Sequence, residues 1–127
     1  LTNLIENAAY FSKQKSPDFA RVTILVGHNK VSKQAIIEIQ DNGYGVALDD
    51  LDHIFEPFYT SESSKSGLGL YLAKQFCEMN MARLDYVAAQ EGARFRITFA
   101  TAEQVQRQLE KRDDFSIRDN TKLATAV

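Results

Sequence analysis

The chain has 127 residues, of which 44% are hydrophobic and 25% charged, a composition that predicts one globular domain with a real core. Its formal net charge of -2 provides no basic footprint for a nucleic-acid backbone, so nucleic acid is not an expected partner. A single cysteine, Cys77, excludes an internal disulfide and favours a reducing, cytoplasmic compartment. No apolar run approaches the roughly 18 residues of a membrane-spanning helix, so this segment is expected to make no direct membrane contact.

The first predicted element is an amphipathic helix over residues 1 to about 14, in which apolar residues recur every three or four positions. Asn3 and Asn7 lie one turn apart and share a face of this helix. Asparagine is a poor helix former, so the pair indicates a purpose other than helix formation, and two exposed helix asparagines are the alternative. Because no capping residue precedes Leu1, we expect the helix to begin further upstream.

Two β-hairpins are predicted next along the chain. Residues 21–27 and 35–41 are short β-branched runs joined by a polar turn, and residues 82–90 and 93–100 form a second pair about Glu91 and Gly92. Residues 35, 37, 39 and 41 share a face, so the carboxylate of Asp41 is expected on the core side of its strand. Phe95, Ile97 and Phe99 are expected to face the same core.

A Gly-, Asp- and Ser-rich passage runs from residue 42 to residue 66, interrupted by IFEPFY, and its length is typical of a lid or binding loop. A helix is predicted from Gly67, mostly buried through two apolar rows. The first row is Leu68, Leu72, Phe76 and Met79, and the second is Leu70, Ala73 and Cys77. Residues 101–112 are expected to form one short helix, followed to residue 127 by a tail or linker without assigned function.

Two glycine motifs bracket that passage, DNGYG at 41–45 and SGLGLYLAK at 66–74. Glycine permits close approach of the backbone to a ligand, and a helix N-terminus offers unpaired N–H groups to phosphate, so Gly67 and Gly69 are candidates to cradle a nucleotide's phosphates. Asp41 is a candidate acceptor for an adenine amino group, because an unpaired buried carboxylate is costly. Taken singly, each glycine motif is equally compatible with a tight turn, and Asp41 alone is better explained as an aspartate that starts a turn.

Four stretches in this order, NLIENAAYF, DNGYG, IFEPFYTSE and SGLGLYLAK, resemble the N, G1, F and G2 boxes of the ATP-binding catalytic domain of bacterial sensor histidine kinases. That family belongs to the superfamily of gyrase, heat-shock chaperone and mismatch-repair ATPases. The resemblance covers roughly residues 1–100 and leaves residues 101–127 as an extension. It implies an α+β fold of the Bergerat type, a two-layer α/β sandwich with a mixed, mostly antiparallel sheet covered on one face by helices. It also implies that the opening strand of this fold would precede Leu1.

The same resemblance implies ATP and Mg²⁺ as cofactors and gives roles to individual residues. Asn7 would offer its amide oxygen to Mg²⁺, and Asn3 would lie beside the phosphates. Hydrolytic relatives carry a water-activating glutamate at the position of Asn3, and an amide cannot take that proton, so Asn3 favours phosphoryl transfer. With Asn3 and Asn7 as the catalytic pair, the implied ATP-binding residues are Asn3, Asn7, Tyr10, Asp41, Gly43, Gly45, Phe55, Phe58, Lys65, Ser66, Gly67, Leu68, Gly69 and Leu70.

Phe55 and Phe58 resemble the box that anchors a mobile lid, with ordinary core packing as the alternative. The hydroxyls at positions 59–61 follow in this lid, where solvation on the surface is expected and contact with phosphate is the alternative. Tyr10 stands where many kinases place Lys or Arg, so one cationic phosphate contact is either absent or supplied by Lys13, Lys65 or another group. Lys65 itself replaces a common glycine and brings a charge near the phosphates, and the glycine pair common after the second box's helix is missing.

The implied function is to bind Mg-ATP and to donate the γ-phosphate to a histidine on a separate helical dimerisation domain of the same kinase. A response regulator would be reached indirectly, and the parent protein is expected to be a homodimer. The parent protein would be cytoplasmic, or this domain would be the cytoplasmic part of a membrane-bound sensor. Neither His28 nor His53 is followed by the acidic residue of the phosphoacceptor motif. The open alternatives are a gyrase-like ATPase, an anti-sigma-type serine kinase and a degenerate nucleotide-binding interaction module.

Overall fold

Two hairpins join edge to edge to form the sheet. In the computed structural model, which describes residues 1–63 and 65–125, β1 (Val22–His28) pairs with β2 (Ala35–Asp41) and β3 (Ala82–Val87) pairs with β4 (Arg94–Phe99). β2 also pairs with β4, so the strand order is β1-β2-β4-β3. These pairings are all antiparallel, which confirms the α+β class and the mostly antiparallel sheet; the described strands include no parallel pair.

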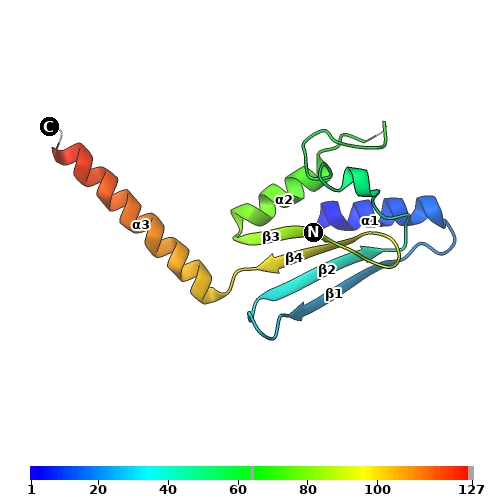
Figure 1. Ribbon diagram of the computed structural model, residues 1–127, viewed down its shortest axis with the longest axis horizontal. Coiled ribbons are helices and arrows are strands. Elements are labelled where there is room, and N and C mark those ends of the chain that lie inside the picture. The colour runs from blue at the N-terminus through cyan, green and yellow to red at the C-terminus, as the bar shows by residue number, and fades with distance from the viewer. Residues whose placement is uncertain (64, 126–127) are drawn as a thin grey trace.

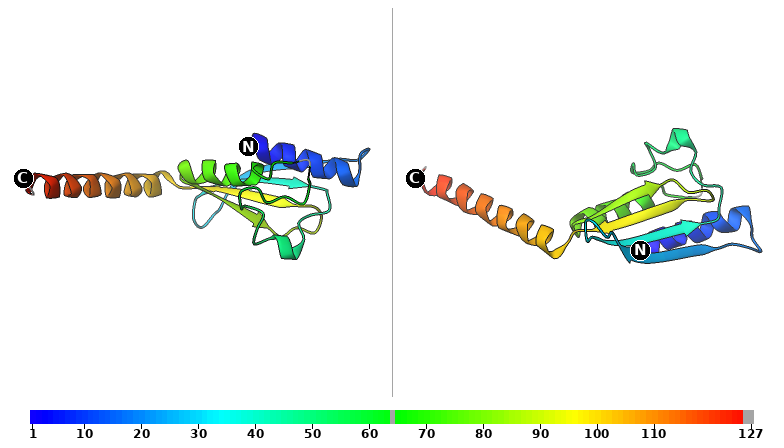
Figure 2. Two further views of the ribbon diagram at one scale, coloured as in Figure 1. Left: turned by 90° about the horizontal axis from the view of Figure 1, so that it is seen from above. Right: turned by 60° about the horizontal axis from the view of Figure 1, so that its bottom comes forward.

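Helices α1 (Thr2–Lys15) and α2 (Gly69–Met79) lie on one face of this sheet (Figure 2). The bounds of α1 agree with the predicted helix to within a residue or so, and α2 begins two residues later than predicted. The long connection between β2 and α2 contains one short 3-10 helix, η1 (Leu48–Asp50). Both the helical cover and the two predicted hairpins are therefore confirmed.

The prediction that most of α2 is buried is wrong. Ala73 is buried, and Leu70 and Cys77 pack against the core. In the other predicted row, Phe76 and Met79 are 56% and 77% exposed, and Leu72 is also exposed. Periodicity correctly grouped these side chains on one face, but it carries no information about whether another element covers that face.

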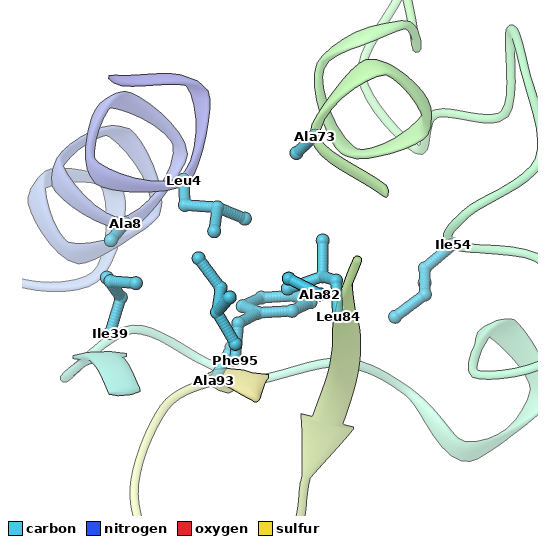
Figure 3. Close-up of a cluster of buried hydrophobic side chains, with 10 residues drawn as sticks. Leu4, Ala8, Ile39, Ile54, Ala73, Ala82, Leu84, Ala93 and Phe95 are labelled. Atoms are coloured by element: carbon cyan, nitrogen blue, oxygen red, sulfur yellow. The ribbon is translucent and has the colours of Figure 1, made fainter. Parts of the chain in front are cut away.

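The core fills the space between the sheet and the two helices (Figure 3). It combines side chains from α1, α2, three strands, the turn between β3 and β4 and the connection before α2: Leu4, Ala8, Ile39, Ile54, Ala73, Ala82, Leu84, Ala93, Phe95 and Ile97. The alternation that buries Ile39 on β2 also buries Asp41, which is 5% exposed, as its place in the strand predicted. A carboxylate is thus held at the edge of an apolar core.

Helix α3 (Ala102–Thr125) follows β4 and extends away from the sheet (Figure 1). It is about twice as long as the helix predicted for residues 101–112, so the predicted tail is wrong as far as residue 125; residues 126–127 lie outside the described part. A capping box starts the helix, because the Gln104 N–H donates to Thr101 Oγ1 at 3.2 Å and the Thr101 N–H donates to Gln104 Oε1 at 2.8 Å. None of the described helices is long and apolar enough to cross a membrane.

Candidate functional site

A pocket of about 290 Å³ lies between α1, the end of β2, the long connection and the start of α2. Nine of the fourteen predicted site residues line it: Asn3, Asn7, Asp41, Gly45, Lys65, Ser66, Gly67, Gly69 and Leu70. The other five lie outside its lining: Tyr10, Gly43, Phe55, Phe58 and Leu68. The fold therefore gathers most of the residues that the four motifs marked, although the motifs are far apart in sequence.

One part of the pocket is built around the carboxylate of Asp41. Its Oδ1 accepts hydrogen bonds from the backbone N–H of Gly43 at 2.8 Å and of Ala93 at 3.1 Å. Burial raises the pKa of the Asp41 carboxyl above its ordinary 3.8, while these two bonds and the charge of Lys15 oppose the rise. Within the described part of the chain no group donates to Oδ2, so this oxygen is the acceptor available to a ligand amino group.

Two glycines allow the backbone to close around this carboxylate. Gly92, in the turn between β3 and β4, has a φ of 65°, and a Cβ there would overlap the carbonyl oxygen of Asp41. A Cβ on Gly43 would lie 2.9 Å from both Asp41 Oδ1 and the Phe11 carbonyl oxygen. Gly43 thus supports the aspartate and does not line the pocket. The sequence predicted Gly92 only as a turn residue. Its contact with Asp41 could be suspected only from its place in the turn between β3 and β4, since β4 pairs with β2.

A buried polar network behind Asp41 ties α1 to the end of β2. Ser12, which is 0% exposed, donates to Asn42 Oδ1, and the Arg21 N–H donates to Ser12 Oγ at 2.7 Å and to Asn42 Oδ1 at 2.9 Å. Asn42 in turn donates to the Phe19 carbonyl at 2.8 Å. Fully bonded buried networks of this kind rigidify a structure. Sequence reasoning missed Ser12, whose signal was its position four residues after Ala8 on the inner row of α1.

Toward the start of α1 the pocket is lined by Asn3 and Asn7. Asn3 Nδ2 donates to the carbonyl of Gly69 at 3.4 Å, and this glycine begins α2. Asn7 Oδ1 accepts a hydrogen bond from Lys65 Nζ at 3.2 Å. Both asparagines therefore lie beside Gly69 at the start of α2, where the first N–H groups of the helix have no partner within the helix.

Lys65 reaches into this part of the pocket from the loop before α2. Its Nζ lies 3.7 Å from the ring centroid of Tyr10 and 4.7 Å from that of Phe11. Burial lowers the pKa of Lys65 below its ordinary 10.5, and the charges of Glu62 and Glu6 oppose the fall. Tyr10 does not line the pocket, but its ring contacts the Lys65 side chain, which does.

The loop from Phe58 to Gly67 is pinched at its base. The Phe58 N–H donates to the Gly67 carbonyl at 3.0 Å, and a Cβ on Gly67 would lie 2.5 Å from the carbonyl carbon of Phe58. Both residues have positive φ, 66° and 71°. The side chain of Phe58 is 73% exposed and therefore not part of the core, whereas Phe55 packs edge-on against Phe95 with centroids 6.1 Å apart. Leu68 joins this loop to α2.

Several lining residues were expected on the surface or were not singled out. Tyr59, Thr60 and Ser61, for which solvation was the favoured prediction, line the pocket, and the Tyr59 hydroxyl donates to Asp50. The pocket also includes acidic and apolar residues for which no part in the site was predicted: Glu6, Asp50, Ala93 and Phe95. No local motif marks them, because they reach the pocket through the path of the loop and the packing of β4.

The fold and this pocket place the chain in a known class. Residues 1–103 match the family described as histidine kinase-, DNA gyrase B-, and HSP90-like ATPase, and the chain belongs to this family. Within the family it is a catalytic domain of the histidine kinase type. It is 43% identical over 101 residues to the sensor protein kinase PilS of Pseudomonas aeruginosa and 35% identical over 115 residues to the sensor protein ChvG of Agrobacterium fabrum. These matches cover 79% and 81% of this chain but only 19% and 18% of the two relatives.

Solved structures agree with this assignment. The mycobacterial sensor histidine kinase MprB is 29% identical with a TM-score of 0.61, and the match covers 76% of this chain and 66% of that one. Full-length ShkA in complex with AMPPNP is 25% identical with a TM-score of 0.62, covering 79% and 20% of the respective chains. The resemblance drawn from the four motifs is therefore confirmed.

Proposed function

We propose that this domain binds Mg-ATP and donates the γ-phosphate to a histidine on a separate helical dimerisation domain of a two-component sensor kinase. The observation that carries the proposal is the convergence of Asn3, Asn7 and Asp41 on one pocket with two glycines before and at the start of α2, Gly67 and Gly69. A buried acceptor suits the adenine amino group, and amides beside a helix start suit a triphosphate. The chain spans about a fifth of the relatives it matches, so the activity of a whole kinase is part of this proposal.

Asn7 fits a magnesium ligand. Its amide oxygen already accepts a bond from the ammonium of Lys65 at 3.2 Å, so the oxygen points into the pocket at a cationic group. Amide and phosphate oxygens are hard ligands of the kind that Mg²⁺ takes, usually with several waters. The metal, when bound, would neutralise charge on the phosphates.

The other side chains position the nucleotide. Asp41 orients the base through Oδ2 while Gly43 and Ala93 hold Oδ1. Asn3 cannot accept a proton as a carboxylate does, and its amide steadies the first residue of α2. Phosphoryl transfer depends mostly on positioning and charge stabilisation, so transfer to an external acceptor does not require a general base from this chain.

Calorimetric titration of a non-hydrolysable ATP analogue, with and without Mg²⁺, tests the binding site. We expect tighter binding with Mg²⁺ for the wild-type protein and loss of that magnesium-dependent part in Asn7→Ala, because the variant lacks the amide oxygen. Asn80→Ala, which removes an exposed asparagine at the end of α2, is the matched control. An unchanged magnesium dependence in Asn7→Ala would rule out the ligand assignment.

The acceptor is tested separately by incubating the protein and a candidate histidine-containing dimerisation domain with labelled ATP. Acid-labile phosphate on that partner supports the proposed transfer. Acid-stable phosphate would indicate a serine kinase, and steady phosphate release without any acceptor would indicate a gyrase-like ATPase.

We further propose a homodimeric parent, an indirect link to a response regulator, a cytoplasmic location, and a division of this chain into the ATP-binding part, 1–100, and the extension, 101–127.

A further inference from the structure

Lys65 occupies the position at which a metal ion would meet Asn7. Its Nζ lies 3.2 Å from Asn7 Oδ1 and sits over the face of the Tyr10 ring, with Phe11 on a second side. These three contacts all come from α1, whereas Lys65 comes from the loop that precedes α2. The ammonium is therefore held against α1 by one hydrogen bond and two aromatic rings.

The Asn7 oxygen cannot serve this ammonium and a metal ion together. Magnesium binds its oxygen ligands at about 2.0–2.1 Å, and a lysine ammonium bonded to the same oxygen would bring two positive charges into near contact. Repulsion between like charges at such a distance favours one occupant at a time. Lys65 must therefore leave Asn7 when the metal arrives with its nucleotide.

The charges around the pocket indicate where the ammonium goes. Among the described residues that line the pocket, Lys65 is the sole basic side chain, against three carboxylates: Glu6, Asp41 and Asp50. The nearby Lys15 is engaged elsewhere, with the Gly43 carbonyl at 3.3 Å and with Glu91 at 3.7 Å. Polyphosphate bound beside Asn3 and Asn7 would thus meet one side-chain cation from this chain.

The loop geometry keeps Lys65 close to this position. Gly67 lies only two residues away, and its carbonyl accepts a hydrogen bond from the Phe58 N–H at 3.0 Å, which ties the two ends of the loop together. A side chain as long as lysine can move by rotation of its own bonds while its backbone stays anchored. Exchange between the amide and the phosphates is therefore within its reach.

We propose that Lys65 is an internal cation that shares the Asn7 site with Mg²⁺. It holds the Asn7 amide oxygen in the nucleotide-free domain, yields it to the metal when Mg-nucleotide binds, and then contacts the phosphates. The inference rests on the proposed function. It adds that one lysine both opposes metal binding and supports the binding of nucleotide without metal.

Calorimetry with ADP on the full 127-residue chain tests this exchange through the ratio of the dissociation constants without and with Mg²⁺. In Lys65→Met we expect ADP without metal to bind about tenfold more weakly, because a charge-assisted contact is lost. The loss should be smaller with Mg²⁺, which no longer competes with an ammonium, so the ratio should rise about fivefold. Lys74→Met is the matched control, since Lys74 also lies over an aromatic ring, Phe55 at 4.8 Å, but lines no part of the pocket.

A ratio in Lys65→Met equal to that of the wild type and of Lys74→Met would overturn the inference. If the wild type binds no ADP at all, the proposed function falls and this inference falls with it, whereas binding with an unchanged ratio overturns the inference alone. A second measurement, by NMR, uses the wild-type chain and does not depend on whether a variant folds. In carbon-13 spectra the terminal methylene of Lys65 should be shifted upfield by the Tyr10 ring, and saturating Mg-ADP should remove that shift. A shift that persists at saturation would show that the ammonium does not leave.

Discussion

Asp41→Asn is the substitution that tests the base-binding end of the pocket most directly. In the wild-type chain Oδ1 accepts the N–H groups of Gly43 and Ala93 at 2.8 and 3.1 Å, and an asparagine oxygen can accept the same two bonds. The other carboxylate oxygen becomes an NH₂ group, which only donates. The amino group of adenine is also a donor, so the contact that we propose would become donor against donor while the fold is kept.

The expected magnitude follows from the charge of the lost acceptor. Hydrogen bonds to charged groups contribute about 1.5–3 kcal/mol, which corresponds to a loss of about 10- to 100-fold in ATP affinity. Inorganic triphosphate lacks the base and should bind with unchanged affinity. Inosine triphosphate carries a carbonyl oxygen in place of the amino group and should lose less than ATP. Calorimetry with the three ligands and Mg²⁺ measures these differences, with Asp85→Asn, an aspartate paired with Arg83 outside the pocket, as control.

Equal losses of ATP and triphosphate in Asp41→Asn would refute the reasoning and make Asp41 purely structural. The variant also tests the effect of burial. Burial raises the pKa of Asp41 above 3.8 in the folded chain, so the folded state favours the protonated carboxyl. The contribution of this carboxyl to stability is therefore complete below pH 3.8 and is lost as pH rises through the folded-state pKa. Asparagine does not titrate, so the stability of the variant relative to wild type should increase through that window. Urea unfolding at about pH 3 and about pH 7 gives the comparison.

Two further predictions concern the backbone and a surface pair. Gly92→Ala should lower the free energy of unfolding by about 2 kcal/mol or more, because the φ of Gly92 is 65° and the new Cβ would overlap the Asp41 carbonyl oxygen. Denaturant unfolding measures this loss, with Gly27→Ala as the control, since a Cβ on Gly27 would have nothing within 4 Å. Similar losses in both variants would contradict the packing argument. A hydrogen bond that the His53 ring donates to the Glu56 carboxylate raises the pKa of His53 above 6.5. The stabilisation from this pair is therefore complete below 6.5 and is lost as pH rises through the raised pKa. Glu56→Gln should bring the pKa of His53 back toward 6.5 in an NMR titration, and an unchanged pKa would assign the shift to another group.

Local sequence patterns predicted the parts of the site that depend on one element at a time. Spacing of four residues placed Asn3 and Asn7 on one face of α1, and both line the pocket. Strand alternation predicted the burial of Asp41, and the glycines before α2 predicted its start beside the pocket. Each of these features follows from the period of a single helix or strand, which the sequence contains directly.

Features that depend on contact between distant segments could not be predicted in this way. The overlap of Gly92 with Asp41 arises because the turn of one hairpin meets the strand end of the other, and the contact of Lys65 with Tyr10 depends on the path of the loop. Likewise, the exposure of Phe76 depends on what lies beside α2 and not on its periodicity. The length of α3 could not be predicted for a different reason, because the second half of this helix has no apolar period in the sequence.

The buried hydrogen bonds of Ser12 and Asn42 fix the separation between the two ends of the pocket, at Asn7 and at Asp41. Asn7 and Ser12 belong to the same helix, in which each residue advances about 1.5 Å, and Ser12 is bonded to the residue that follows Asp41. On the proposed function, the span from the base acceptor Asp41 to the metal ligand Asn7 is therefore made of hydrogen-bonded parts that keep it at one length. Each added phosphate then extends the reach of a bound nucleotide from Asp41 toward Asn7. Discrimination among adenine nucleotides by phosphate number would then be a property of the backbone framework more than of any one side chain that faces the ligand.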